Sequence, residues 1–283
     1  MTRRTVAIER DITYKRRYKT EDLRIALEPE AAAVYCRSLP DGTLNDKNGS
    51  LSLQERGVTD AFQPGGCYMI VDLGGGTVDT TVHEVAEDGR LVEIRQASGG
   101  PWGGTSVDET FYEFVVRKFG KEFIEQFRIE RASEWMKLSM DFETQKRKLK
   151  FETNYNIKIE IPQRLIAESN MQVADIQSYN KLSIENDEFK NFFRPSAEDI
   201  VAHIQSILSE VSKVDLILLV GGFATSGYVS HVIRDAFPDK RVVVPLQAVV
   251  ASPPSLYIGR SLSVVHIWSV VMEGHSLLFT SGL

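Results

Sequence analysis

Residues 67–85 of this 283-residue chain read CYMIVDLGGGTVDTTVHEV, and this stretch decides the fold. The run from Tyr68 to Leu73 is short and mostly apolar, which is typical of a buried strand. After three glycines, Val78, Thr80 and Val82 alternate with polar residues. This period of two, rich in β-branched residues, predicts a second strand. The stretch is therefore predicted to form a β-hairpin with a glycine turn.

The glycine turn has the composition of a phosphate-binding site. Glycine lets the backbone adopt positive φ and approach a ligand closely, and successive N–H groups in such a turn can bind an anion. The threonine that follows the glycines offers a hydroxyl donor. The candidate phosphate-binding residues are Gly74, Gly75, Gly76 and Thr77. The alternative is an ordinary hairpin turn without a ligand.

Two aspartates flank the turn. Asp72 lies near the end of the first strand, and Asp79 adds a second acidic group. A carboxylate beside a phosphate is repulsive unless a cation lies between them, so Asp72 indicates Mg²⁺. Because Mg²⁺ gives up its water shell reluctantly, we expect Asp72 to hold the metal through water.

The pattern excludes two familiar phosphate-binding loops. No Gly-Lys-Ser/Thr sequence ends the turn, as a Walker A loop requires, and a dinucleotide-binding loop opens a helix, whereas this turn opens a strand. A phosphate turn inside a hairpin, with an aspartate at the end of the strand, is typical of the actin-like ATPase fold.

The rest of the chain predicts an α/β organisation. After the loop SGGPWGG at 98–104, the sequence SVDE at 106–109 fits a capping box for a helix that ends at Gly120. Further helices are predicted from Ser133 and over 196–212. Residues 216–220 form a continuous apolar run, typical of a strand covered on both faces. A Gly-Gly turn, a helix capped by Ser226 and a strand at 241–245 complete an α/β crossover pattern.

Bulk properties exclude several classes of function. The net charge of −6 argues against a nucleic-acid partner, which would call for a basic surface. The two cysteines, Cys36 and Cys67, make no disulfide framework, and no Cys/His group has metal-ligand spacing. We expect no signal peptide, because the N-terminus is polar and no apolar segment follows its arginines. We expect no membrane partner, because His266, Glu273 and His275 interrupt the apolar stretch 262–283. The expected location is the cytoplasm.

Several motifs, in order, resemble those of the heat-shock-70 chaperones, a branch of the actin-like ATPases. VDLGGGTVD at 71–79 resembles their second phosphate loop, LEPEAAAVY at 27–35 their connecting helix, and LLVGGFA at 218–224 their adenosine loop. GGPWGGTSVDETF at 99–111 resembles the entry to their upper subdomain, and DFETQKRKLKF at 141–151 their adenosine-binding helix. The residues in several of these motifs most resemble those of the heat shock 70 kDa protein 12 branch. The resemblance covers residues 24 to 260.

The resemblance implies a nucleotide site for ATP or ADP with Mg²⁺. Glu28 and Asp72 would be its catalytic residues, with Glu28 assisting the magnesium waters. Glu143, Lys146, Arg147 and Lys150 share one helical face by spacing, and a solvated face is the plain interpretation. The resemblance implies Glu143 and Lys146 on the ribose hydroxyls and Arg147 against adenine. Gly221 and Gly222 would let the backbone pass the ribose and α-phosphate.

The resemblance also predicts the fold class and the segments. We expect an actin-like ATPase (ribonuclease H-like) α/β lobe with an inserted α+β subdomain and an incomplete first lobe. The predicted segments are a poorly ordered lead-in (1–23), a first-lobe remnant (24–64), a second-lobe core (65–99 and 194–260), an inserted upper subdomain (100–193) and an unassigned tail (261–283).

The chain also departs from the family pattern. No second phosphate hairpin precedes residue 24, and Phe223, Ala224 and Thr225 replace the polar and basic residues usual in the adenosine loop. Because phosphoryl transfer needs charge stabilisation from both sides, we expect little or no ATP hydrolysis. The expected function is that of an ATP-binding, chaperone-related protein, with client or co-chaperone proteins as candidate partners. The alternatives are a non-catalytic interaction module of the same fold and, less favoured, a small-molecule kinase.

Overall fold

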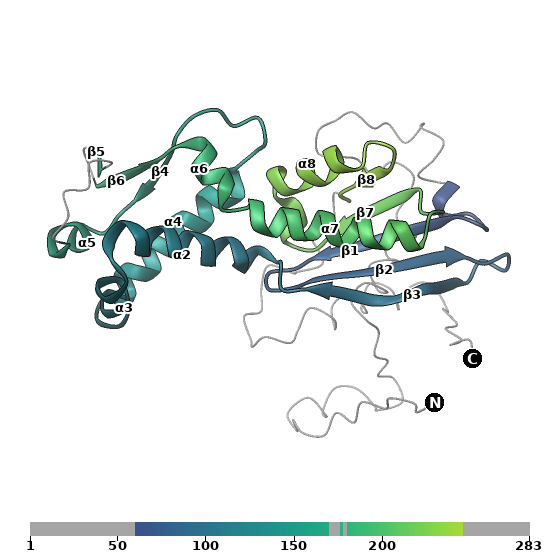
Figure 1. Ribbon diagram of the computed structural model, residues 1–283, viewed down its shortest axis with the longest axis horizontal. Helices are drawn as coiled ribbons and strands as arrows, with labels where there is room; N and C mark the ends of the chain where they lie inside the picture. The colour runs from purple at the N-terminus through teal and green to yellow at the C-terminus, as the bar shows by residue number, and fades with distance from the viewer. Residues whose placement is uncertain (1–59, 170–175, 178–179, 246–283) are drawn as a thin grey trace, which may run out of the picture.

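The computed structural model describes residues 60–169, 176–177 and 180–245 (Figure 1). The predicted lead-in, connecting helix and tail, and with them Glu28, lie outside the described residues. The described residues form a large mixed sheet with two helices on one face, and a helical part with a small second sheet beside it (Figure 1).

The large sheet has five strands in the order β3-β2-β1-β7-β8. Strand β1 (Cys67–Leu73) pairs antiparallel with β2 (Val78–Val85), which pairs antiparallel with β3 (Leu91–Gly100). On its other side β1 runs parallel to β7 (Leu216–Val220), and β7 runs parallel to β8 (Arg241–Val243). The register pairs Asp72 with Asp79 across the hairpin and with Val220 across the parallel pair.

Both faces of the central strands are covered. Helices α7 (Arg194–Glu210) and α8 (Gly227–Ala236) lie along one face, where Met69 and Val71 join their apolar side chains in one core (Figure 1). On the opposite face Tyr68 and Ile70 join a second cluster with Ala61 of the 3-10 turn η3 (Asp60–Phe62). Every residue of β1 and β7 is buried, as the apolar runs in the sequence predict.

The helical part contains α2 (Gly104–Phe119), α3 (Lys121–Glu130) and α4 (Ala132–Lys148). Its small antiparallel sheet has the order β4-β6-β5, from β4 (Ile157–Glu160), β5 (Ile176–Gln177) and β6 (Lys181–Ile184). Helices α5 (Gln163–Glu168) and α6 (Asn186–Asn191) complete it. The Phe111 ring on α2 stacks on the Phe142 ring on α4, with centroids 3.9 Å apart. The segment boundaries expected from the sequence stay a prediction.

The sequence predicts most of the described elements but misses others. The hairpin, the helix end at Gly120, strand β7 and the Ser226 cap are confirmed, and Ser226 Oγ accepts from the Val229 amide at 3.4 Å. The prediction of a capping box at 106–109 is wrong. Helix α2 begins at Gly104 without a side-chain cap, and Ser106 Oγ donates to the Gly103 carbonyl instead. Strand β3 and helix α3 are not predicted from the sequence.

Candidate functional site

The carbonyls of the glycine turn are held by the start of α2. The amides of Gly103, Gly104 and Thr105 donate to the carbonyls of Gly76, Gly74 and Gly75, at 3.3, 3.2 and 2.7 Å respectively. These are amides at a helix N-terminus, which have no partner inside the helix. These hydrogen bonds therefore give partners both to the first amides of α2 and to the carbonyls of the turn. They also fix the direction in which the turn's carbonyls point.

The amides of the same turn are left for another acceptor. Gly74 N–H donates to the Thr77 carbonyl at 2.9 Å, but in the described part of the chain the amides of Gly75, Gly76 and Thr77 donate no hydrogen bond. These three residues are exposed. An added Cβ at Gly75 or Gly76 would meet nothing within 4 Å. The turn thus has three consecutive N–H groups on exposed residues that donate no hydrogen bond within the described residues, and such groups can bind an anion.

Gly103 is required by the close approach of α2 to this turn. A Cβ on Gly103 would lie 2.7 Å from the carbonyl oxygens of Gly74 and Gly75. That separation is below any normal contact distance, so any larger residue at 103 would displace the turn or the helix start.

The two flanking aspartates have different surroundings. Asp72 is 9% exposed and lies at the carboxyl end of β1. Gly221, with φ of 87°, follows β7 and packs so closely on it that a Cβ there would collide with Asp72 Oδ1. Asp79 is exposed, and its Oδ2 accepts from Thr77 Oγ1 at 3.1 Å. Asp72 is therefore the more enclosed carboxylate at the base of the turn.

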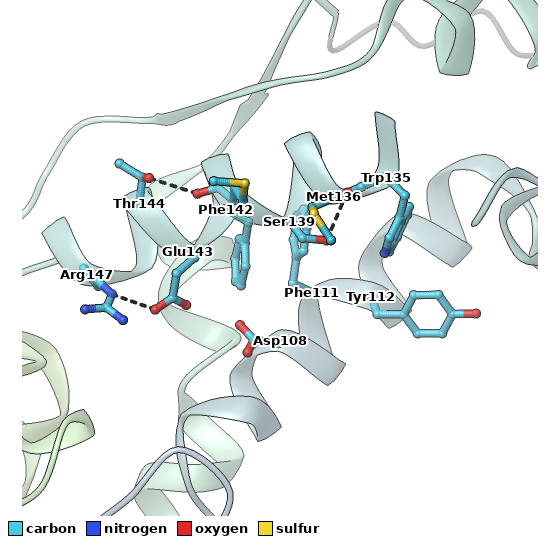
Figure 2. Close-up of a pocket in the computed structure, with 11 residues that line it drawn as sticks. Asp108, Phe111, Tyr112, Trp135, Met136, Ser139, Phe142, Glu143, Thr144 and Arg147 are labelled. Atoms are coloured by element: carbon cyan, nitrogen blue, oxygen red, sulfur yellow. Dashed lines mark hydrogen bonds and ion pairs between the residues drawn. The ribbon is translucent and has the colours of Figure 1, made fainter. Parts of the chain in front are cut away.

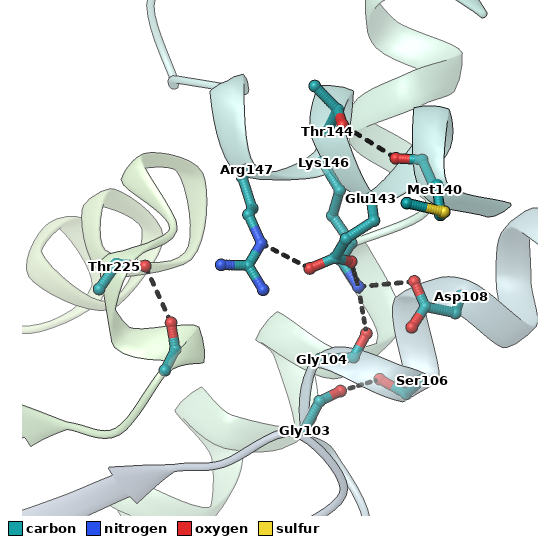
Figure 3. Close-up of polar contacts among 11 residues, drawn as sticks. Gly103, Gly104, Ser106, Asp108, Met140, Glu143, Thr144, Lys146, Arg147 and Thr225 are labelled. Atoms are coloured by element: carbon teal, nitrogen blue, oxygen red, sulfur yellow. Dashed lines mark hydrogen bonds and ion pairs between the residues drawn. The ribbon is translucent and has the colours of Figure 1, made fainter. Parts of the chain in front are cut away.

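Helix α4 carries a buried lysine that ties it to α2 (Figure 3). The Lys146 side chain is 8% exposed, and its Nζ donates to the Gly104 carbonyl at 3.2 Å and to Asp108 Oδ1 at 2.6 Å. It also pairs with Glu143 Oε2 at 2.5 Å. Burial raises the pKa of Asp108 even though Lys146 donates to it.

Arg147 and Glu143 form the outer part of this network. Arg147 is 76% exposed, and its Nε donates to Glu143 Oε1 at 2.7 Å. Burial raises the pKa of Glu143, but the hydrogen bonds from Lys146 and Arg147 bring it below its usual value. In Figure 3 the Arg147 guanidinium lies between α4 and the loop that carries Thr225. That loop is the 3-10 turn η4 (Phe223–Thr225), which follows Gly221 and Gly222.

Two loop residues that the sequence singles out have structural contacts. Thr225 Oγ1 donates to the Gly222 carbonyl at 2.8 Å. Phe223 is buried, and its ring lies 3.5 Å from the position of a Cβ on Gly104. The Phe223 ring therefore packs against the first residue of α2.

A cavity of about 530 Å³ lies beside this network, between α2 and α4 (Figure 2). Asp108, Glu143 and Arg147 line one part of it, and Tyr112, Trp135 and Met136 another. Behind Tyr112 and Trp135, the Arg128 guanidinium lies 4.7 and 5.3 Å from their ring centroids. The cavity lining is mainly apolar, and its charged groups are shared with the α4 network.

The structure brings together most of the residues that the sequence singles out. The glycine turn, Asp72 and Gly221 lie at one edge of the sheet, and Glu143, Lys146 and Arg147 are linked to them through Gly104. Asp108, Gly103 and Gly104 have contacts that the sequence analysis does not anticipate. The paired glycines at the start of α2 are the sequence signal that could have identified Gly103 and Gly104.

Comparison with known proteins places the chain in a family. A family model described as Hsp70 protein matches residues 62–250, about two thirds of the chain. The chain belongs to the Hsp70 family. The actin-like ATPase fold of that family confirms the predicted fold class, with the five-stranded mixed sheet as its core.

Among Hsp70 relatives, the chain is 30% identical to human heat shock 70 kDa protein 12A and 32% identical to human heat shock 70 kDa protein 12B. The matches cover 80% and 81% of this chain. The chain spans 41% of the length of each relative. The chaperone protein DnaK of Thermoplasma volcanium is 24% identical over 64% of the chain and 29% of its own length. The predicted likeness to the 12 branch is thereby confirmed.

Two features are absent from the described part of this Hsp70-family chain. None of its helices has the length and apolar character needed to cross a membrane. Across residues 60–169, 176–177 and 180–245, no three His, Cys, Asp or Glu side chains gather as a metal-binding group.

Proposed function

We propose that this Hsp70-family chain binds ATP and ADP together with Mg²⁺. The observation that carries the proposal is the glycine turn, whose carbonyls bond to the start of α2 while the amides of the exposed residues Gly75, Gly76 and Thr77 donate no hydrogen bond within the described residues. Backbone amides arranged in this way hold a polyphosphate without a positively charged side chain.

The residues around the turn fit the rest of the ligand. Asp72, enclosed at the end of β1, is a hard oxygen donor that would hold Mg²⁺ through its waters. When bound, the metal supplies charge neutralisation between the phosphates and this carboxylate. Glu143 has unused acceptor sites for ribose hydroxyls, and the exposed Arg147 guanidinium offers a planar face for adenine stacking. Gly221 and Gly222 leave the backbone beside Asp72 free of side chains.

Hydrolysis by this chain alone is proposed to be weak or absent. Phosphoryl transfer depends on positioning and charge stabilisation around the whole transferred group. The described residues supply one phosphate hairpin, on one side of the ligand. The proposed role is therefore nucleotide binding within a chaperone-related protein. A cytoplasmic location and partners among client or co-chaperone proteins remain proposals from family likeness.

Calorimetric titration of the purified chain with Mg-ATP, Mg-ADP and ATP in EDTA tests this function. We expect binding that requires metal and that Asp72→Asn weakens. The matched control is Asp88→Asn, in the β2–β3 turn, where an exposed aspartate pairs with Arg90 at 2.6 Å. Thermal melting of each variant verifies folding.

The other outcomes separate the alternatives. A folded chain that binds none of the three ligands would contradict the proposal and favour a non-catalytic interaction module. Transfer of phosphate to an added sugar would favour a small-molecule kinase.

A further inference from the structure

The helical part also contacts the core of the large sheet away from the chain connections β3–α2 and α6–α7. The turn that follows α4 lies against the start of α8. A Cβ on Gly227 would lie 3.4 Å from Lys150 Cγ and 3.5 Å from the Leu149 carbonyl oxygen, which is ordinary van der Waals contact. The end of α4 and the start of α8 therefore touch directly.

Two aromatic rings stack beside this contact. The ring of Phe151, in the turn after α4, lies parallel to the ring of His231 on α8, with centroids 3.8 Å apart and planes 13° apart. The Phe151 ring also lies 6.1 Å from the ring of the buried Tyr228. We call the Phe151–His231 pair the ring clasp. Because it joins a residue of the helical part to a residue of the core, it opposes the separation of α4 from α8.

The turn that carries Phe151 is fixed to the helical part. The Thr153 amide donates to the Lys150 carbonyl, and the Lys150 amide donates to Thr153 Oγ1, both at 3.1 Å. The Thr153 carbonyl accepts from Asn186 Nδ2 at 2.7 Å and from Lys190 Nζ at 3.0 Å, and both donors lie on α6. The Lys190 ammonium also lies 5.5 Å from the centroid of the Phe151 ring. Phe151 is thus held as part of the helical part, on a turn closed by hydrogen bonds.

The ring clasp is close to both sides of the proposed adenosine site. Arg147 lies four residues before Phe151, and Thr225 lies six residues before His231. In Figure 3 the Arg147 guanidinium lies between α4 and the loop that carries Thr225. Movement of α4 away from α8 would therefore widen the gap between Arg147 and this loop.

We propose that Phe151 and His231 are positioning residues, which hold Arg147 and the η4 loop at the separation that an adenosine group requires. The inference rests on the proposed nucleotide function. The glycine turn is held separately, by the amides at the start of α2. The ring clasp should therefore matter for the adenosine half of a ligand and not for its phosphates.

Preorganisation sets the size of the effect. Without the ring clasp, a fraction of the molecules has the adenosine gap too wide, and the apparent affinity falls with the fraction that remains competent to bind. A stacked pair of rings shifts such an equilibrium by roughly two- to tenfold. Loss of the ring clasp should raise the Kd by a factor in that range.

The test compares Phe151→Ala with the wild-type chain for three ligands. Calorimetry measures Mg-ATP and Mg-tripolyphosphate, and ligand-observed NMR measures adenosine. We expect the Kd values for Mg-ATP and adenosine to rise by the same factor, roughly three- to tenfold. The Kd for tripolyphosphate should stay within about twofold, because the glycine turn keeps its own contacts.

A second variant reaches the same contact from α8. His231→Ala should give the same pattern, and the double substitution should add nothing further, because each change removes one and the same stack. If Phe151→Ala does not fold, as thermal melting would show, His231→Ala carries the test. Tyr155→Ala is the matched control, because Tyr155 is an exposed aromatic residue, and it should leave all three Kd values unchanged.

Conservative variants and an NMR signal separate ring stacking from general packing. Phe151→Tyr keeps a ring and should bind nucleotide as the wild-type chain does. Phe151→Leu keeps an apolar side chain without a ring and should behave as Phe151→Ala does. The ring current of Phe151 should move the His231 ring protons upfield, and this shift should be lost in the leucine and alanine variants.

Three results would overturn the ring clasp: unchanged Mg-ATP affinity in a folded Phe151→Ala chain, tripolyphosphate binding that weakens as much as Mg-ATP binding, or wild-type affinity in Phe151→Leu. A wild-type chain that binds none of the ligands contradicts the proposed function itself, and the inference with it.

Discussion

The backbone of Gly221 lies directly against the carboxylate of Asp72, at the carboxyl ends of two neighbouring parallel strands. Gly221 has φ of 87°, and a Cβ there would collide with Asp72 Oδ1 and lie 2.6 Å from the Leu73 carbonyl oxygen. The turn after β7 and the hairpin after β1 therefore form one continuous edge. In α/β sheets, ligands bind outside the carboxyl ends of the strands, so this is the edge at which a ligand is expected.

Gly221→Ala should destabilise the protein. The substitution combines a left-handed backbone conformation with a steric collision, and we expect a loss of roughly 1–3 kcal/mol in the free energy of unfolding. Urea unfolding measures it. Gly222→Ala is the control, because a Cβ there meets nothing within 4 Å, and its effect should stay within about 0.5 kcal/mol. Equal effects of the two substitutions would contradict the assignment of strain to Gly221.

Gly75→Ala and Gly103→Ala should separate ligand binding from folding. At Gly75 a methyl group meets no protein atom but enters the space beside the free amides, so Mg-ATP affinity should fall while the melting temperature stays constant. At Gly103 it meets the turn carbonyls at 2.7 Å, so both quantities should fall. Calorimetry and thermal melting measure the pair. Unchanged Mg-ATP affinity in a folded Gly75→Ala variant would argue against the turn as the phosphate site.

Arg147→Ala should weaken adenine nucleotides and leave tripolyphosphate binding unchanged. A stacked guanidinium contributes about 0.5–2 kcal/mol, so the Kd for Mg-ATP should rise roughly two- to thirty-fold. Lys148→Ala, one residue along α4 on an exposed position, supplies the control. If the two variants bind Mg-ATP equally well, Arg147 does not contact the base.

His83 should make the fold sensitive to acid. It is 3% exposed and stacks on Tyr68, and burial lowers its pKa to about 4. The unfolded chain takes up the proton near pH 6.5, so stability is present above that pH and is lost as the pH falls toward 4. The loss is up to about 3 kcal/mol.

Urea unfolding between pH 7 and pH 4 measures this loss. His83→Phe keeps an aromatic ring without a titrating group and should flatten the curve by a similar amount. The same pH dependence in both proteins would rule out His83 as the acid-sensitive group.

Phosphate release from ATP by the chain alone should stay at background. The described residues supply one phosphate hairpin, and a single hairpin gives the transferred group charge stabilisation on one side only. A colorimetric assay of phosphate released with Mg-ATP in excess measures it. Turnover well above background that Asp72→Asn abolishes would disprove this expectation.

The sequence by itself determined the features that depend on neighbouring residues. Alternation over Val78–Val85 and the glycine run fix a hairpin, and the apolar run at 216–220 fixes a buried strand. Ser226 caps its helix because an N-cap bond reaches only three residues along the chain. The order of the motifs along the chain also indicates the family. All of these are local patterns, which a sequence displays directly.

Which polar groups are free and which are hydrogen-bonded depends on contacts between distant parts of the chain. The spacing of α4 puts Lys146 on one face with Glu143 and Arg147, but Asp108 and Gly104, from a different helix, accept two of its hydrogen bonds. The capping-box prediction fails for a similar reason, since the amides of Gly103–Thr105 bond to the carbonyls of the distant turn and start α2 earlier. Hydrogen-bonding capacity is used up by partners that folding brings together, and no local pattern records that.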